Sequence, residues 1–204
     1  MAWKDLTPKT FASIRELTGI SARTQEEHYE LYKGYVGKVN EIQKKLDAVD
    51  RTTANQIFSD LRSLRVDYSF ALGGMKNHEI FFGHLGGKGG APSGRLKEQI
   101  ERDYPSYDAW LADFKASGLA ARGWVWLAYD HDLSMLTTVV GDAQNTFPIW
   151  NATPVLALDV YEHAYWFDYG RARAKYIDAF FNNLDWSVVA AHLDRALSMQ
   201  PATK

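Results

Sequence analysis

Histidine side chains are the groups in this 204-residue chain that could bind a transition metal, because the sequence contains six histidines and no cysteine. The absence of cysteine excludes a disulfide scaffold, a thiolate metal site and a cysteine nucleophile. A transition-metal site would therefore combine imidazole with carboxylate donors, a set that suits manganese, iron or zinc.

Three of the histidines read as structural residues. His131 lies in a polar turn and His192 in a late amphipathic helix, so we expect both at the surface. His84 comes just before a glycine-rich segment, where an imidazolium would favourably cap the C-terminal end of a helix. We do not expect these three residues to be metal ligands.

His28, His78 and His163 differ, because each lies in a densely aromatic and apolar part of the sequence. Any one of them alone would more often be a core histidine bonded to the backbone. Asp159 lies four residues before His163 at the end of an apolar strand, where a carboxylate must be paired, hydrogen-bonded or metal-bound. On spacing alone, a metal site and a set of core histidines remain about equally good interpretations.

Two tyrosines share a helix face with His28, because Tyr32 and Tyr35 follow it by four and seven residues. Glu27 is the competing ligand at this position. We interpret residues 24–27, which read T-Q-E-E, as a capping box, and this role accounts for Glu27 without a metal. Tyr35 could be plain packing or, beside a metal, could orient bound solvent and relay a proton.

The elements that would carry these residues follow from the spacing of apolar positions. In the first half, helical spacing extends over residues 24–46, 52–72 and 76–85. Residues 86–92 read G-G-K-G-G-A-P, which cannot hold regular structure cheaply, and they mark the strongest boundary in the chain. We therefore predict an N-terminal helical domain over residues 1–88.

Beyond this boundary the pattern mixes helical and strand periods. The expected elements are helices near 94–103 and 107–117, strands over 124–129, 133–140 and 155–160, and helices near 168–181 and 187–197. The predicted fold class is α+β, with a C-terminal α+β domain over residues 89–204.

Composition narrows the class of protein further. A formal charge of −2 and an isoelectric point near 6.3 argue against a nucleic-acid-binding protein. No apolar run approaches the roughly 18 residues of a membrane span, so we expect no membrane association. The first residues have no signal-peptide pattern, and we expect a cytoplasmic protein.

Several separated segments carry a resemblance to a known family. Residues 159–165 read D-V-Y-E-H-A-Y and resemble the D-x-W-E-H-A-Y signature of the iron/manganese superoxide dismutases. Residues 77–82, N-H-E-I-F-F, are similar to the N-H-x-x-F-W ligand helix of that family, and residues 123–127 match its G-W-x-W-L strand. The resemblance covers most of the chain and implies a helical hairpin domain followed by an α+β domain with a three-stranded antiparallel sheet.

The resemblance also implies a site and a reaction. It implies one manganese or iron ion per subunit, held by four protein ligands and a solvent molecule, that dismutates superoxide; the ligands would be His28, His78, Asp159 and His163. The family's first ligand lies eight residues before the Tyr35–Val36 pair, a position that Glu27 occupies here. Eight residues on one helix face require a π-bulge, whereas seven are two regular turns. We therefore expect a helix without a bulge and His28 as the ligand.

Further residues take roles by the same resemblance. Those that would hold solvent or relay protons are Tyr35, Gln144 and Tyr32, the last at a position where the family usually has a histidine. Those that would form a water-excluding aromatic wall are Trp124, Trp126, Tyr161 and Phe82. Glu162 and Tyr165 would cross the two-fold axis of a homodimer, Glu162 pairing with the partner's ligand histidine. Arg173 would attract the superoxide anion, with Lys33 and Arg122 as further candidates.

The choice of metal and two alternative functions complete the predictions. Gly74 together with Gln144 is the manganese-like arrangement of the family, which favours manganese over iron. One alternative is a metal-binding dimeric member with little or no dismutase activity, because the first-helix motif is altered. The other is a non-haem iron oxygenase that uses His78, Asp159 and His163, with His28 as a spectator.

Overall fold

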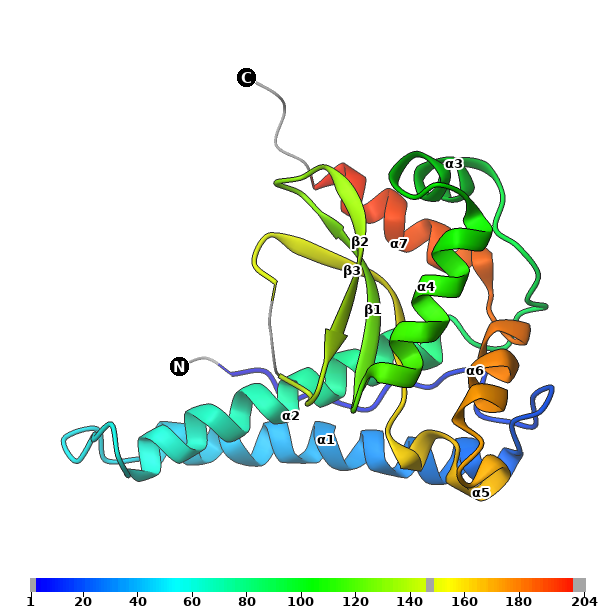
Figure 1. Cartoon of the computed structure of the whole chain (residues 1–204). Coiled ribbons are helices and arrows are strands. Elements are labelled where there is room, and N and C mark those ends of the chain that lie inside the picture. The colour runs from blue at the N-terminus through cyan, green and yellow to red at the C-terminus, as the bar shows by residue number, and fades with distance from the viewer. Residues whose placement is uncertain (1–2, 146–148, 200–204) are drawn as a thin grey trace.

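A computed structural model describes residues 3–145 and 149–199, and a long antiparallel helical hairpin forms one side of it (Figure 1). The hairpin consists of α1 (Ala22–Ala48) and α2 (Asp60–Gly83). Apolar residues at helical spacing on α1 face α2, so the two helices bury a continuous seam, which contains Val36, Val39, Ile42 and Leu46.

The first helix begins earlier than the capping-box interpretation predicts. Ser21 is its N-cap and accepts a hydrogen bond from the backbone N–H of Thr24 at 3.2 Å. The Thr24 hydroxyl instead donates to the Asp168 carboxylate at 2.7 Å, and Glu27 is exposed inside the helix. The capping-box prediction is therefore wrong, because a serine three residues upstream satisfies the free N–H group first.

The second helix is one continuous element rather than the two predicted helices. It begins after the N-cap Ser59 and runs without a break through Gly73 and Gly74. These glycines do not end the helix; they let other segments approach it, since a Cβ on Gly74 would lie 2.6 Å from the Tyr35 ring. Residues 50–58 form irregular turns where the first turns of a helix were expected. In these irregular turns the side chains of Asp50 and Asn55 accept hydrogen bonds from backbone N–H groups.

An antiparallel three-stranded sheet follows two helices of the C-terminal half, as the resemblance implies. The helices are α3 (Gly94–Asp103) and α4 (Tyr107–Ala120), and the strands are β1 (Trp124–Asp130), β2 (Met135–Gly141) and β3 (Ala152–Asp159). β1 lies in the centre, in the order β2-β1-β3. Trp124 pairs with both Gly141 and Asp159, so the register brings the start of β1 and the last residues of β2 and β3 to the same end of the sheet.

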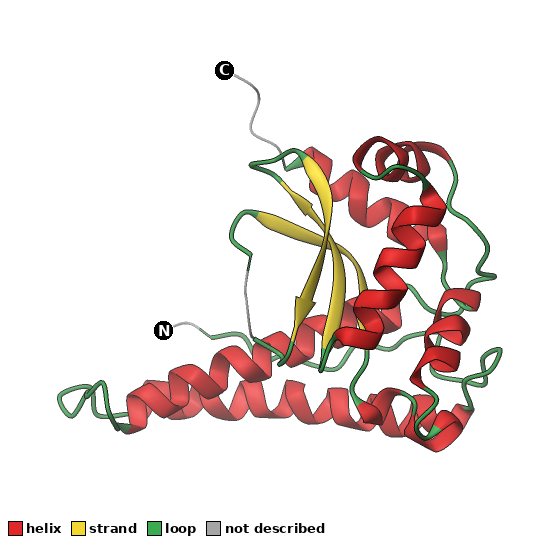
Figure 2. Ribbon diagram, viewed as in Figure 1, coloured by secondary structure: helices red, strands yellow, loops and turns green. Residues whose placement is uncertain are grey.

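Helices cover the sheet and connect it to the hairpin (Figure 2). The remaining elements are the 3-10 turn η1 (Glu162–Ala164), α5 (Trp166–Tyr169), α6 (Arg173–Asn182) and α7 (Trp186–Ser198). α4 packs on β1 and β2, and α7 packs on β3. Strand β3 also contacts α2 of the hairpin. The fold class is α+β, as predicted.

The principal hydrophobic core includes residues from both sides of the glycine-rich segment. Tyr32 and Phe81 come from the hairpin, and Trp110 and Trp124 from the C-terminal half. Division into domains at residues 88 and 89 stays a prediction. None of the helices within residues 3–145 and 149–199 is both long and apolar enough to cross a membrane.

Candidate metal centre

Four side chains from four separate elements converge where the sheet meets the hairpin. They come from α1, α2, the end of β3 and η1, and are His28, His78, Asp159 and His163. One potential ligand atom from each lies within 4.8 Å of those of the other three. The first three side chains are buried and 29% of the His163 side chain is exposed, so the group lies largely inside the protein.

The carboxylate of Asp159 is the common neighbour of the three imidazoles. Its Oδ2 atom lies 3.1 Å from His28 Nε2, 3.0 Å from His163 Nε2 and 3.5 Å from His78 Nε2. Donors that each lie about 2.1 Å from a common ion are separated by roughly 3 to 3.6 Å for angles of about 90 to 120°. The three distances to Asp159 therefore fit donors that share a single metal ion.

His78 has a buried ring nitrogen without a hydrogen bond among the described residues, which is the clearest indication that this group suits a metal ion. Its Nδ1 lies 2.6 Å from the Gly74 carbonyl oxygen, and because a carbonyl can only accept, Nδ1 carries the proton. Its Nε2 is buried without a hydrogen bond among the described residues. Burial, with a smaller effect of His28, lowers the pKa of His78 to about 3, so Nε2 presents a lone pair towards the other donors.

Of the remaining three groups, His28 and Asp159 are in the charge states that bind metal, whereas His163 would have to give up a proton to do so. Burial lowers the pKa of His28, although Asp159 opposes this shift. Burial alone would raise the pKa of Asp159, but the neighbouring His163 and His28 outweigh it and keep the carboxylate ionised. The same carboxylate raises the pKa of His163 against the effect of burial. A cation at the centre of the group would replace His163 as the counter-charge of Asp159.

Two contacts that the sequence does not indicate fix Asp159. Its second oxygen, Oδ1, accepts the backbone N–H of Tyr161 at 3.0 Å. Its backbone carbonyl accepts the hydroxyl of Tyr176 at 2.7 Å, and Tyr176 is fully buried. No local pattern indicates that the Tyr176 hydroxyl reaches the Asp159 carbonyl, so only the tertiary fold reveals this contact.

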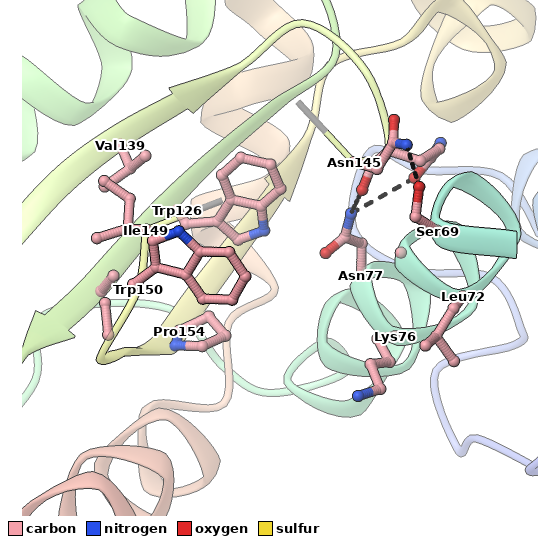
Figure 3. A pocket seen from close by; sticks show the side chains of 14 residues that line it. Ser69, Leu72, Lys76, Asn77, Trp126, Val139, Asn145, Ile149, Trp150 and Pro154 are labelled. Carbon is pink, nitrogen blue, oxygen red and sulfur yellow. Dashed lines mark hydrogen bonds between the residues drawn. The ribbon is translucent and has the colours of Figure 1, made fainter. Parts of the chain in front are cut away.

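Gln144 connects the group to Tyr35 and to the sheet. Its side-chain oxygen accepts the Trp124 indole N–H at 3.0 Å, and its amide donates to the Tyr35 hydroxyl at 3.2 Å. Asn77 donates to the Gln144 backbone oxygen at 3.2 Å (Figure 3), a contact that the sequence also left unassigned. The Tyr35 ring packs against His78 with centroids 5.3 Å apart. The structure thus places Gln144 and Tyr35 together, beside one of the four converging residues.

Aromatic rings surround the four residues. Phe82 packs on His28 at a centroid distance of 4.9 Å, Trp124 on His78 at 5.2 Å and Tyr161 on His163 at 5.3 Å. Trp126 stacks on the outer side of Trp124 at 6.1 Å and does not contact a histidine of the group. Phe81, which the sequence analysis did not single out, packs on His28 at 5.0 Å.

Comparison with known proteins places the chain in a family. Residues 92–192 match the family described as iron/manganese superoxide dismutases, C-terminal domain. The chain is 42% identical to the Fe superoxide dismutase of Aquifex pyrophilus over 205 residues, which cover 98% of this chain and 96% of that protein. The chain belongs to the iron/manganese superoxide dismutase family. Other members are a Mn superoxide dismutase of Haloferax volcanii, 36% identical over 169 residues (82% of this chain, 83% of that protein), and the Fe superoxide dismutase of Cupriavidus metallidurans, 39% identical over 187 residues (89% and 92%).

This member of the superoxide dismutase family brings His28, not Glu27, to the group of donors. α1 is regular α-helix from Ala22 to Ala48 and contains no π-bulge. His28 is therefore two turns before Tyr35, on the buried face, and Glu27 is exposed to solvent. The placement agrees with the expectation from helical spacing.

Tyr32 lies on the same buried face, but its contacts lead away from the four converging residues. Its hydroxyl accepts the backbone N–H of Lys9 and donates to Glu79 at 3.1 Å. Burial raises the pKa of Tyr32 to about 12. These bonds do not reach Gln144 or Tyr35, and a part for Tyr32 in proton relay stays a prediction.

Tyr165 and Glu162, the two residues expected at a subunit interface, differ in burial and in their contacts within the chain. The Tyr165 hydroxyl is buried and accepts a bond from Arg173 at 3.0 Å, whereas 60% of the Glu162 side chain is exposed. Arg173 also donates to the Ala121 carbonyl at 2.7 Å and lies 3.7 Å from Glu162. These contacts occupy several of the N–H groups of Arg173, the residue that we expected to attract superoxide. Of the other two candidates, Lys33 pairs with Glu30 and Arg122 with Asp142.

The three remaining histidines lie outside the metal-binding group. His84 is fully buried, contacts the Ala157 carbonyl at 2.9 Å, and has a pKa lowered to about 3 by burial, so it is not a charged helix cap. His131 contacts the Thr153 hydroxyl and His192 the Val155 carbonyl, and both are half-buried rather than at the surface. The polarity of a turn or helix does not reveal that a neighbouring strand covers the imidazole.

Proposed function

We propose that the protein is a superoxide dismutase that takes one manganese or iron ion at His28, His78, Asp159 and His163. The observation that carries the proposal is the buried lone pair of His78 Nε2, which lies 3.5 Å from the Asp159 carboxylate in a group whose four ligand atoms are all within 4.8 Å of one another. Membership of the superoxide dismutase family supports the same reaction, in which two superoxide anions and two protons become dioxygen and hydrogen peroxide.

The protein has to hold the metal and supply protons. Once bound, a manganese or iron ion supplies the one-electron oxidation and reduction that dismutation needs. The four ligand residues come from four packed elements, so the donors are fixed before the ion arrives. One carboxylate and three imidazoles, with His163 giving up its proton on binding, are donors that suit a divalent or trivalent ion.

Gln144 and Tyr35 are the residues that we propose handle the proton. The Tyr35 hydroxyl accepts a bond from Gln144 and so keeps its own proton for another acceptor. Burial raises the pKa of Tyr35, although the Gln144 bond opposes the shift, so the hydroxyl remains a neutral proton donor. Trp124 fixes the other end of the Gln144 amide, which orients the donor group.

The aromatic wall restricts what else can reach the site. Phe82, Trp124 and Tyr161 each cover one imidazole. A dry and rigid wall strengthens the electrostatic interactions within it and keeps the ligands in place. Trp126 supports Trp124 from behind and thus belongs to the wall indirectly.

A homodimer and a cytoplasmic location belong to the proposal. The exposed Glu162 carboxylate next to His163 supports a dimer, because the ring N–H of a partner's imidazole would give it a hydrogen-bond donor. The neighbouring Trp166 and Phe167 are about half exposed, and large apolar side chains on a surface favour association. Sedimentation analysis of the protein and of a Glu162→Ala variant tests the dimer, which we expect the substitution to weaken.

Manganese is the metal that we propose for turnover, on the ground of Gly74 and Gln144. Relatives named for iron and for manganese both occur at substantial identity, and imidazole–carboxylate donors bind either ion. Reconstitution with each metal separately, followed by elemental analysis and measurement of superoxide decay, decides between them. We expect higher activity per bound ion with manganese.

The decisive test compares two adjacent residues of α1. In His28→Ala we expect loss of the metal and of superoxide consumption, whereas Glu27→Ala, at an exposed position, retains both. A correctly metallated protein with no activity above that of the free ion would contradict the proposal and favour the inactive member. Retention of iron by His28→Ala together with substrate-dependent oxygen uptake would instead indicate the oxygenase.

A further inference from the structure

Gly73 of α2 is in unusually close contact with the segment that carries Gln144. A Cβ atom at this position would lie 2.2 Å from the Gln144 backbone oxygen and 2.9 Å from its carbonyl carbon. Ordinary van der Waals contact begins near 3.4 Å, so one of the two segments would have to retreat by about 1 Å. The atoms in the way belong to a backbone, which cannot rotate aside as a side chain can.

The next turn of α2 also binds the Gln144 backbone oxygen, through a hydrogen bond. The Asn77 amide, four residues further along α2, donates to the Gln144 backbone oxygen at 3.2 Å. Gly73 thus permits the approach, and Asn77, whose hydrogen bonds Figure 3 draws, fixes it. Only 4% of Gln144 is exposed, and its amide bonds to Trp124 and Tyr35. A shift of its backbone would therefore strain both side-chain bonds.

We propose that Gly73 is a positioning residue that sets where the Gln144 amide lies relative to Tyr35 and the metal-binding group. It acts by having no Cβ atom, which lets α2 and the Gln144 backbone touch. The inference rests on the proposed function, because it assigns the effect of Gly73 to the residue that orients the proton donor.

The surroundings of Gly73 explain why the substituted protein should still fold. An apolar pocket of about 550 Å³ borders Gly73, Gln144 and Trp126. This space gives the Gln144 segment room to move away from an added methyl group. Alanine also favours a helix more than glycine does, so α2 itself is not weakened. The expected result is a folded protein with a displaced Gln144.

The test compares Gly73→Ala with Gly83→Ala in the same helix. Gly83 is exposed, and a Cβ there meets no atom within 4 Å outside its own stretch of helix. Both variants are loaded with manganese and, separately, with iron. We expect Gly83→Ala to match the wild type. We expect Gly73→Ala to retain metal but to show a shifted reduction potential, an altered visible spectrum and a turnover number lower by roughly 10-fold.

A double-substitution cycle with Gln144→Ala shows whether Gly73 acts through Gln144. If it does, adding Gly73→Ala to Gln144→Ala changes the potential and the spectrum no further. An unchanged potential and spectrum in Gly73→Ala, or equal shifts with and without Gln144, would overturn the inference.

A crystal structure of Gly73→Ala gives a readout that does not depend on activity. We expect the Gln144 backbone to move into the pocket and the Tyr35 contact to lengthen. If the wild type binds no metal or does not consume superoxide, the proposed function fails, whatever the crystal structure of the variant shows. If the wild type is active and Gln144 keeps its place in Gly73→Ala, only the present inference fails.

Discussion

One carboxylate oxygen of Asp159 faces all three imidazoles of the group. The backbone contact from Tyr176 and the N–H of Tyr161 fix this residue from the side opposite the imidazoles. A carboxylate oxygen that faces three imidazole nitrogens needs a fixed orientation, since a small rotation of the carboxylate would change all three distances together. The residues behind Asp159 should therefore matter for metal retention.

Replacing Tyr176 by phenylalanine tests this dependence. The variant leaves the buried Asp159 carbonyl without its partner, which should lower the free energy of unfolding by about 1–3 kcal/mol and reduce the metal content. Urea unfolding and elemental analysis measure the two effects. Tyr104→Phe is the matched control, because the Tyr104 hydroxyl contacts Thr138 away from the site. Full metal content in Tyr176→Phe would contradict the argument.

Tyr35→Phe tests the proton donor. The raised pKa keeps the Tyr35 hydroxyl protonated at neutral pH, so the donor is lost only as the pH rises above the ordinary tyrosine value of about 10. We expect wild-type activity to be level through neutrality and to fall at strongly alkaline pH. The variant should bind metal normally, turn over about 10-fold more slowly, and lack that alkaline fall. Stopped-flow superoxide decay across pH measures both; an identical alkaline limb in the variant would exclude Tyr35 as its origin.

Sequence motifs located His28, His78, Asp159 and His163 because each lies in a segment with distinctive local letters or spacing. The contacts of Asn77, Phe81 and Tyr176 could not be found in this way. Asn77 bonds to Gln144, which lies 67 residues away, and Phe81 of α2 packs on His28 of α1. Tyr176 bonds to the backbone of Asp159, 17 residues before it, and no local pattern indicates that this bond forms. Local patterns carry no information on which residues a helix meets in three dimensions.

Among the elements, α2 shows how a local rule fails for a tertiary reason. A pair of glycines in a helical pattern predicts a break, yet α2 continues through Gly73 and Gly74. The cost in helix propensity is offset by packing, because α1 and the Gln144 segment can approach only where α2 has no side chains. The strands and the helices near 94 and 107 were predicted more accurately, since their apolar periods have no such competing explanation.

The packing of α1 against α2 predicts opposite effects on stability for alanine substitutions at two glycines. In Gly74→Ala the new methyl group would overlap the Tyr35 ring, and we expect a loss of about 1–3 kcal/mol in the free energy of unfolding. Gly37→Ala, in the interior of α1, meets no atom within 4 Å and should stabilise the protein by about 0.5–1 kcal/mol through helix propensity. Calorimetry measures both, and two changes of the same sign would refute the packing explanation.

At the scale of the whole molecule, the proposed ligands join segments that are far apart in the sequence. His28 and Asp159 are separated by 131 positions, and the helical hairpin and the sheet meet at their contact. A metal ion bound there interacts with α1, α2, β3 and η1 at once. An ion that binds the folded but not the unfolded chain stabilises the fold by mass action, so metal and tertiary structure should be lost together.

Removal of the metal should therefore lower the melting temperature. If free metal exceeds its dissociation constant by about 1,000-fold, the bound ion contributes about 4 kcal/mol, and for a chain of this size the melting temperature falls by roughly 8–16 °C on chelation. Calorimetry before and after chelation, and after metal is restored, measures the shift. His163→Ala is the control, because its partly exposed side chain can be removed at small packing cost and the chelator should then have little effect. A chelator-induced shift of equal size in His163→Ala would place the stabilising ion outside the four proposed ligands.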